Sequence, residues 1–397
     1  MDITYNDSTA TKATSPWGVV ACMALLTFLL VASEFLPVSI LTPIAADLGI
    51  TEGQAGQGIS ISALFAIFTS LFGNTLLGRI DRRFVVMGYT ALLIVAALLT
   101  ALAPDYLTYL VGRALVGISV GGFWSLSTSL VARVVLPADL PKALAVLQVG
   151  TALAAVLAAP MGAFLGGLVG WRGAFLALLP VTIVAFVWQL SAFPSLRADH
   201  PVSPRRMFGL LRTPVFVVGM AATTLAFMGN FSPSTYFRPF LEGVTGLGVN
   251  QISLMLLGIG AAGLAGTTLI GFILRRHLAA ALVGLPAVLA TVAVLLIALG
   301  AEPVPTVALL LVWGLCTTPI PVAWNTWMTR LIPRDLEAGG GLQVALIQFA
   351  IGSGAAVGGV LFDQVGWWSP SAFGALLLCG SAALAFAASG QTPESRS

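Results

Sequence analysis

The chain has 397 residues, of which 58% are hydrophobic and only 8% are charged. Its mean hydropathy is +0.99, and a soluble domain of this length cannot bury so much apolar surface internally. The formal charge of +3 arises from arginine-rich connections without a long basic run or interleaved aromatic residues, so the pattern argues against a nucleic-acid-binding platform. The three cysteines, Cys22, Cys316 and Cys379, show neither disulfide nor metal-ligand spacing.

In chain order, twelve apolar stretches are long enough to cross a bilayer, which takes about 20 residues each. The sequence therefore predicts an all-α integral membrane protein with spans at 17–41, 53–77, 84–103, 106–132, 143–169, 174–193, 215–241, 250–273, 278–300, 304–329, 341–364 and 370–390. A polar linker, 194–214, divides them into two six-helix bundles, 17–193 and 215–390. Tails at 1–16 and 391–397 flank the bundles.

The connections between spans alternate in charge. Basic residues gather in every second connection, at Arg79, Arg133, Lys142, Arg275 and Arg330 among others, whereas the opposite connections carry mainly acids and one exception, Arg172. Because positively charged loops are retained in the cytoplasm, we expect both termini there.

One pattern occurs twice. Glu34-Phe35-Leu36-Pro37-Val38-Ser39 matches Asn230-Phe231-Ser232-Pro233-Ser234-Thr235 at an offset of 196 positions. The same offset relates further pairs along the chain: Asp139 and Asp335, Gly162 and Gly358, Gly170 and Gly366, and Trp171 and Trp367. A parallel duplication of six helices is a transporter arrangement in which the substrate site lies between the halves near the membrane midplane, and it implies alternating access.

Only the first copy of this pattern carries a charge. A carboxyl group in hydrocarbon is costly unless it is neutralised, paired or facing water, so Glu34 is a functional candidate. Arg113 is predicted at a similar depth, about 10 Å from the outer end of its helix at 1.5 Å per residue. The pair is either a structural ion pair or a proton-coupling site. At a coupling site, a change in the distance between the two groups would cause Glu34 to bind or release a proton.

Several motifs resemble the signatures of the major facilitator superfamily. They are Gly78-Arg79-Ile80-Asp81-Arg82-Arg83, then Gly112-Arg113 with Gly117, Gly121 and Gly122, and finally Pro160 with Gly162, Gly166 and Gly167. Within the superfamily the chain is most similar to bacterial purine-ribonucleoside efflux permeases of the drug:proton antiporter group. The shared segments are Glu34 to Ser39, Ala55-Gly56-Gln57, Gly121 to Trp124, Pro141 to Leu144, Trp327 to Arg330 and Gln343-Val344-Ala345.

The resemblance implies export of inosine, guanosine and adenosine in exchange for protons across the bacterial inner membrane. It also implies that Asp81 latches neighbouring helix ends and holds the outward-facing state, whereas the arginines beside it serve equally well as topological anchors. The motif lacks the usual second glycine, so its loop geometry departs from the family pattern. The predicted gating residues are Arg79, Asp81, Arg82, Arg83, Pro160 and Gly162.

Polar and aromatic residues at mid-depth are candidates for substrate contact, or for hydrogen bonding between helices. They are Trp124, Gln148, Asn230, Trp324, Asn325 and Gln348. An indole can stack on a purine, and amides can bind ribose hydroxyls and ring edges, so the set suits a nucleoside. Exporters of sugars or of diverse drugs share several of the motifs and remain the alternative.

No motif indicates an enzyme, since no nucleophile with a base, no zinc-binding HExxH and no phosphate loop appears in the sequence. We therefore predict a secondary transporter with protons as the coupling ion and no cofactor or metal. The expected partners are a small-molecule substrate and the lipid bilayer, without nucleic acid, and the expected state is a monomer. A passive facilitator of the same fold is a further possibility that the sequence leaves open.

Overall fold

The structure is a computed structural model that describes residues 16–77, 79–136, 139–196, 209–332 and 336–389. The predicted tails, apart from Pro16, and most of the linker lie outside this part of the chain. The first half contains α1 (Trp17–Ser39), α2 (Leu41–Leu48), α3 (Glu52–Leu76), α4 (Arg82–Ala101), α5 (Tyr106–Val134) and α6 (Leu140–Ala192). After a short η1 (Leu210–Arg212), the second half contains α8 (Pro214–Ser234), α9 (Phe237–Gly243), α10 (Val249–Leu299), α11 (Pro303–Thr317), α12 (Pro319–Leu331), α13 (Leu336–Gln364) and α14 (Ser369–Ser389).

The described chain contains eleven helical segments that are long and apolar enough to cross a membrane, and one of them, Lys142–Ala192, is 51 residues long. This segment changes direction at Gly170, where φ is +74°. Only glycine adopts that left-handed conformation readily, so the long helix is two spans joined by a tight turn. Gly366, its counterpart in the repeat, also has a positive φ and separates α13 from α14. The prediction of twelve spans is thereby confirmed.

Three predicted spans are broken where the sequence places proline. The span predicted at 17–41 ends as α1 at Ser39, two residues beyond Pro37. The span predicted at 215–241 consists of α8 and α9, and α8 ends just after Pro233. Proline lacks the N–H that continues the helical ladder, which explains why both copies of the repeated pattern break at the same point. The span predicted at 304–329 is likewise divided, before Pro319.

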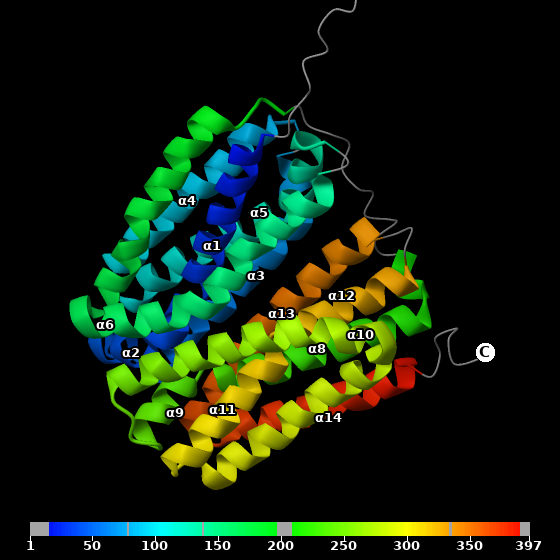
Figure 1. Ribbon diagram of the computed structural model, residues 1–397. Coiled ribbons are helices and arrows are strands. Elements are labelled where there is room, and N and C mark those ends of the chain that lie inside the picture. The colour runs from blue at the N-terminus through cyan, green and yellow to red at the C-terminus, as the bar shows by residue number, and fades with distance from the viewer. Residues whose placement is uncertain (1–15, 78, 137–138, 197–208, 333–335, 390–397) are drawn as a thin grey trace, which may run out of the picture.

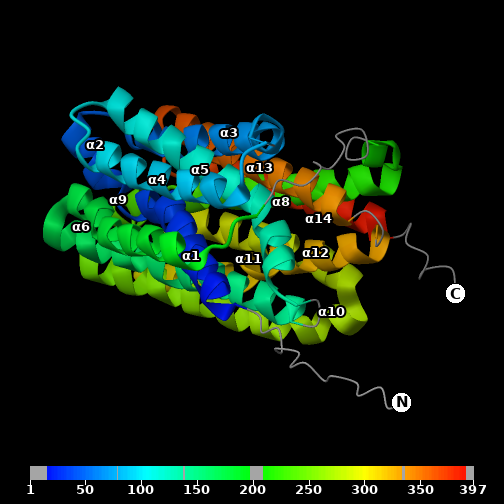
Figure 2. The ribbon, with the colours of Figure 1, turned by 90° about the horizontal axis from the view of Figure 1, so that it is seen from above.

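The two halves pack together at one end of the bundle, and their ribbons diverge toward the end where α1 begins and α14 ends (Figure 1). We call these the closed end and the open end. Figure 2 shows α2 and α9 together at the closed end. Hydrogen bonds join the halves there: Thr51 Oγ1 donates to Asp363 over 2.5 Å, Gly53 N donates to the same carboxylate, and Arg238 donates to the carbonyl of Ser39.

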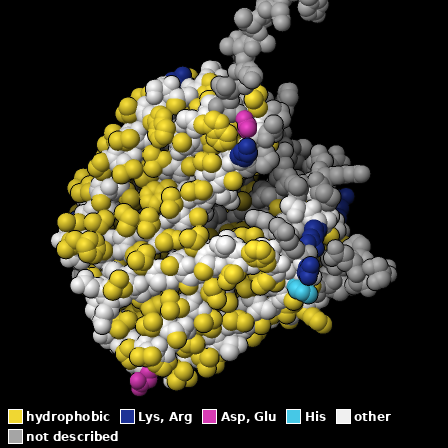
Figure 3. Space-filling view, viewed as in Figure 1, with side chains coloured by type: hydrophobic (Ala, Val, Ile, Leu, Met, Phe, Trp, Pro, Cys, Tyr) yellow, Lys and Arg dark blue, Asp and Glu magenta, His cyan; other side chains and the backbone are white. Residues whose placement is uncertain are grey.

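Apolar side chains cover most of the surface seen in Figure 3, and the charged groups in that view lie toward the ends of the molecule. Large exposed residues such as Phe68, Phe272 and Phe386 contribute to this apolar surface. Such a surface is stable in a bilayer, where helices satisfy their own backbone hydrogen bonds and face lipid. The fold is therefore that of an integral membrane protein, as the composition predicted.

Candidate functional site

Glu34 lies on α1 with only 4% of its surface exposed, at the interface between the two halves. Its Oε1 accepts a hydrogen bond of 3.3 Å from Nε2 of Gln348 on α13. Next to it, Phe35 of α1 stacks on Phe231 of α8 with ring centroids 5.5 Å apart. Both rings belong to an apolar cluster with Ile59 and Ile351 that seals the interface on the closed-end side. The first copy of the repeated pattern thus brings its charge to the contact surface of the halves.

Arg113 of α5 is fully buried, but its guanidinium binds backbone rather than the Glu34 carboxylate. Nη1 donates to Ser33 O over 2.7 Å, Nη2 donates to Glu34 O over 2.8 Å, and Nε donates to Gly58 O over 3.4 Å. Ser33 is four residues before Pro37, and proline cannot donate to the carbonyl at that position. Arg113 satisfies the carbonyl that the proline leaves free.

The sequence left two interpretations of this pair open, a structural ion pair or a proton-coupling site. In the described part of the chain, the Glu34 carboxylate accepts a hydrogen bond only from Gln348, and no ion pair joins it to Arg113. The two residues do meet at one depth, as expected from their positions on the helices. Arg113 contacts the backbone of Glu34 rather than its side chain. The guanidinium supplies the hydrogen-bond donor that Pro37 cannot supply to α1.

The other predicted substrate residues fall into two groups. Gln148 and Asn325 are exposed and Trp124 is half-buried, with its ring edge-to-face against Phe123. Trp324 is 1% exposed and packs edge-to-face on Trp327 in the core of the second half, which leaves it no open face in this conformation. Asn230, the uncharged counterpart of Glu34, is also buried, and its Oδ1 accepts from Thr317 Oγ1 over 3.2 Å.

The predicted gating motif organises the open end of the first half. Asp81 caps α4 by accepting from Arg83 N over 2.9 Å, and it also accepts from Ser195 Oγ and Leu196 N beyond the end of α6. These hydrogen bonds hold the pKa of Asp81 below its usual value. Arg83 extends the contact by donating to Leu190 O, and Arg82 is buried beneath it, whereas Arg79 is exposed. In this conformation the motif fastens α4 to α6 within one half.

Pro160 and Gly162 lie in α6, where it packs on α1. A Cβ atom at Gly162 would collide with Ser39 and Leu36, and one at Gly166 would collide with Ile40. These contacts place the glycines beside the break between α1 and α2. Close packing of small residues is what allows the helices to approach at this point.

The sequence model described as Major Facilitator Superfamily matches residues 23–359 of this chain. The chain belongs to the Major Facilitator Superfamily. It is a transporter and not an enzyme. The superfamily fold is also that of a bacterial homologue of the human lysosomal transporter Spinster, solved in an inward-facing conformation. That structure aligns with a TM-score of 0.73 at 17% identity, covering 94% of this chain and 97% of the other.

Curated relatives of this superfamily member extend over nearly its whole length. A protein named purine ribonucleoside efflux pump NepI, from Escherichia coli O6, is 41% identical over 89% of both chains. The NepI of Escherichia coli K12 is 40% identical over the same share. A protein from Pseudomonas aeruginosa named transcription regulatory protein OpdE is 50% identical over 88% of both chains.

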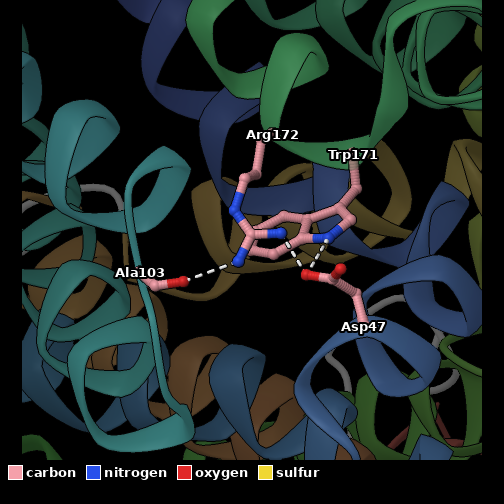
Figure 4. Close-up of polar contacts among 4 residues, drawn as sticks. All are labelled: Asp47, Ala103, Trp171 and Arg172. Atoms are coloured by element: carbon pink, nitrogen blue, oxygen red, sulfur yellow. Dashed lines mark hydrogen bonds and ion pairs between the residues drawn. The ribbon is translucent and has the colours of Figure 1, made fainter.

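At the closed end this facilitator has a polar cluster that the sequence analysis treated only as an exception to the charge pattern. Figure 4 shows Arg172 stacked over the ring of Trp171, 4.3 Å from its centroid, with both side chains bonded to Asp47. Arg172 also donates to Ala103 O over 2.8 Å, so the cluster ties α2 and α6 to the end of α4. Arg172 and the hydrogen bond from Trp171 lower the pKa of Asp47.

Sequence reasoning also missed the partners of the buried groups. These partners are Thr317 for Asn230, Phe231 for Phe35, and Asp363 as a link between the halves; Thr317 and Asp363 belong to no motif. For Phe35 and Phe231 a signal did exist, because equivalent residues of two repeats meet when they lie near the axis that relates them. Arg238 and Glu242, one turn apart in the sequence, form an ion pair of 2.7 Å at the closed end.

Proposed function

We propose that this protein exports purine ribonucleosides such as inosine, guanosine and adenosine in exchange for protons, by alternating access across the bacterial inner membrane. One observation carries the proposal: a carboxyl group, Glu34, is buried where the two halves of a Major Facilitator Superfamily transporter meet. The resemblance to relatives named as purine ribonucleoside efflux pumps, at 41% identity, supports the choice of substrate.

Proton coupling follows from the position of Glu34. A carboxylate in a desolvated environment is costly, and taking up a proton removes that cost. When the halves part at the closed end, the carboxyl group is exposed to the medium on that side and can bind a proton. In the conformation described here the closed end is shut, and the proton leaves toward the open end. Arg113 keeps its charge in both states, because a guanidinium does not deprotonate in proteins, and it holds α1 in register at Pro37.

We assign substrate binding to the depth of Glu34 in the bundle. Trp124 offers a half-buried indole for stacking on a purine, and the amides of Gln148, Asn325 and Gln348 offer hydrogen bonds to the ribose and base edges. Asn230 lies near the contact of the halves and Trp324 supports it from the core. The Arg79, Asp81, Arg82 and Arg83 motif, with Pro160 and Gly162, serves in changing between conformations.

The proposal includes an orientation. The open end carries the basic connections at Arg83 and Arg276, so the positive-inside rule assigns it and both termini to the cytoplasm. The conformation is then inward-facing. We further propose that a monomer suffices, since the site is formed within one chain and needs no cofactor or nucleic acid.

A second candidate function rests on the relative named as a transcription regulatory protein, which is 50% identical. A membrane bundle of this kind affects transcription most directly through the small molecule that it moves. On this hypothesis, a transport-deficient Glu34→Gln variant loses any regulatory effect together with transport, and a variant that keeps regulation without transport would refute the link.

The deciding experiment is uptake of radiolabelled inosine into inside-out vesicles with an acidic lumen. We expect accumulation above the external concentration, its collapse by a protonophore, and alkalinisation of the lumen when inosine is added. Arabinose and a cationic dye serve as matched substrates for the sugar and drug alternatives. Accumulation of either without inosine would replace the proposed substrate, and equilibration without accumulation would indicate a passive facilitator.

A further inference from the structure

The hydrogen bond between Glu34 and Gln348 joins the two halves in the interior of the bundle. Both side chains are buried, with 4% and 6% of their surfaces exposed. The amide nitrogen of Gln348 donates to the carboxylate, whereas its oxygen, Oε1, is buried and has no hydrogen-bond partner among the residues that the structure describes. A buried amide oxygen without a donor is unfavourable, and native proteins seldom leave one unless a ligand or another state satisfies it.

Two neighbouring polar side chains, Arg113 and Asn230, form their hydrogen bonds with other groups. Arg113 donates to three backbone carbonyls, and Asn230 accepts from Thr317 within its own half. Gln348 is therefore the side chain of the second half that directly senses the charge on Glu34. Hydrogen bonds to an ionised group are roughly twice as strong as those between neutral groups, so protonation of Glu34 weakens this contact.

We propose that Gln348 is a shared coupling residue, which binds the ionised Glu34 carboxylate in the empty protein and is released to the substrate during transport. The inference rests on the proposed function and deepens it. The ionised, empty protein is held with its closed end shut by the Glu34–Gln348 contact. A substrate donor, a ribose O–H or a base N–H, binds Oε1 and competes for the amide, which frees the halves to separate.

Protonation of Glu34 breaks the same Glu34–Gln348 contact. When the closed end is open, the Glu34 carboxylate takes a proton from the medium there, and the neutral carboxyl no longer holds Gln348 strongly. The protein can then return without substrate and give up the proton at the open end. Either ligand thus permits the conformational change, and the empty ionised protein does not undergo it, which is the requirement for exchange.

Few other ionisable groups lie near this contact. Arg113 and Tyr109 face it from α5, and Arg238 with Glu242 lies toward the closed end beside Ser39. The facing stretches of α3, α6 and α13, at 54–63, 154–167 and 343–358, contain no Asp, Glu, His, Lys or Arg. Arg113 and Arg238 keep their charge, so Glu34 is the carboxyl group at this contact that can gain or lose a proton.

The test uses spin labels at Leu107→Cys and Val304→Cys, two exposed positions on different halves at the closed end, in full-length protein whose three native cysteines are replaced by alanine. Distances are measured by electron paramagnetic resonance without substrate at acidic and alkaline pH. We expect the short distance to predominate at alkaline pH, and the ratio of closed to open molecules to fall about tenfold on acidification, the effect of losing one charge-assisted bond.

Gln348→Leu is expected to abolish this pH dependence, as is Glu34→Gln. The matched control is Gln343→Leu on the same helix, since Gln343 is also buried, its amide nitrogen has no hydrogen-bond partner in the described part of the chain, and it does not contact Glu34. It should retain the full response. A normal pH response in Gln348→Leu, or its equal loss in Gln343→Leu, would overturn the proposal.

Transport separates this inference from the proposed function. Gln348→Leu should let inosine equilibrate across vesicles but reduce its accumulation ratio to about one, because the empty ionised protein can now change conformation. Proton-driven accumulation that is unchanged in this variant would contradict the role of Gln348. If the parent protein does not carry inosine, the proposed substrate fails, and the distance measurement still decides the coupling contact.

Discussion

The two halves of this transporter have the same scaffold but treat equivalent positions differently. Pro37 and Pro233 break α1 and α8 at matching points. In the first half Arg113 donates to the carbonyl that Pro37 leaves free, whereas the equivalent of Arg113 in the second half is Leu309. There Gly374 packs directly against Gly229, whose carbonyl is the one that Pro233 leaves free. One half uses a buried charge and the other uses close packing to tolerate the same kink.

The same contrast holds for the side chains beside the kinks. Glu34 reaches across to the second half through Gln348, whereas Asn230 bonds to Thr317 inside its own half. At these equivalent positions the first half thus carries a carboxyl group and the second half an amide. The following changes test whether this division is functional.

Glu34→Gln should have the largest effect. The amide keeps the shape of the side chain but cannot ionise, so proton-driven accumulation of inosine should be abolished while the protein folds normally. The matched control is Asn230→Ala in the second half, which should retain proton coupling even if affinity falls. Measurements of accumulation and lumen pH in vesicles compare the two. Accumulation by Glu34→Gln would mean that Glu34 is structural.

Arg113→Leu should destabilise the protein strongly. It leaves the Ser33 carbonyl without a donor, and an unsatisfied buried polar group costs about 1–3 kcal/mol. Arg113→Lys should recover part of this loss, because an ammonium group can reach one carbonyl but cannot reproduce the fork that binds two. Leu309→Met, at the equivalent position, should cost less than about 1.5 kcal/mol. Thermal unfolding in detergent measures all three, and similar losses for Arg113→Leu and Leu309→Met would remove the distinction between the halves.

Trp124→Ala should weaken binding of purine nucleosides by about 1–3 kcal/mol, the typical cost of losing one base stack. A simple sugar has no π-face and should be affected less. Trp324→Phe in the core of the second half should instead lower the melting temperature and leave affinity nearly unchanged. Competition binding with inosine and arabinose provides the readout. Equal losses for both ligands in Trp124→Ala would favour the sugar or drug alternative.

Asp47→Asn should have the smallest effect, because Asp47 and Arg172 are partly exposed and such pairs contribute at most about 1 kcal/mol. The folded-state pKa of Asp47 is lowered, so its contribution to stability is present above the unfolded pKa of about 3.9 and is lost as the pH falls through the folded value. The difference in melting temperature between parent and variant should therefore be seen at pH 7 and shrink at acidic pH. In the second half, Phe240 stacks on Trp367 at the corresponding end, so Trp367→Leu should show a loss that does not change with pH.

Much of the fold could be predicted because membrane spans obey strong local rules. Apolar length located the spans, and the offset of 196 positions pairs Gly170 with Gly366, both of which have a positive φ in the structure. The helix breaks after Pro37 and Pro233 also have a local cause, the missing N–H of proline, although the predicted spans continued through both positions.

The site was less predictable because its contacts depend on which faces of the helices meet. The depth of Glu34 and Arg113 followed from their positions, but the choice between carboxylate and carbonyl depended on the carbonyl that Pro37 leaves free. The link between Glu34 and Gln348 joins residues 314 positions apart and carries no periodic signal. Trp324 and Trp124 look alike in the sequence, and only the packing shows that one ring is in the core.

The constant offset between the halves has a consequence for how such a molecule arose. Two separate identical subunits would place a carboxyl group on both sides of the interface, since symmetry repeats every residue of a self-associating chain. Joining the copies in one polypeptide removes that obligation. Glu34 and Asn230 are then free to diverge, and a carboxyl group in only one of the two copies of the pattern becomes a property that a homodimeric ancestor cannot encode.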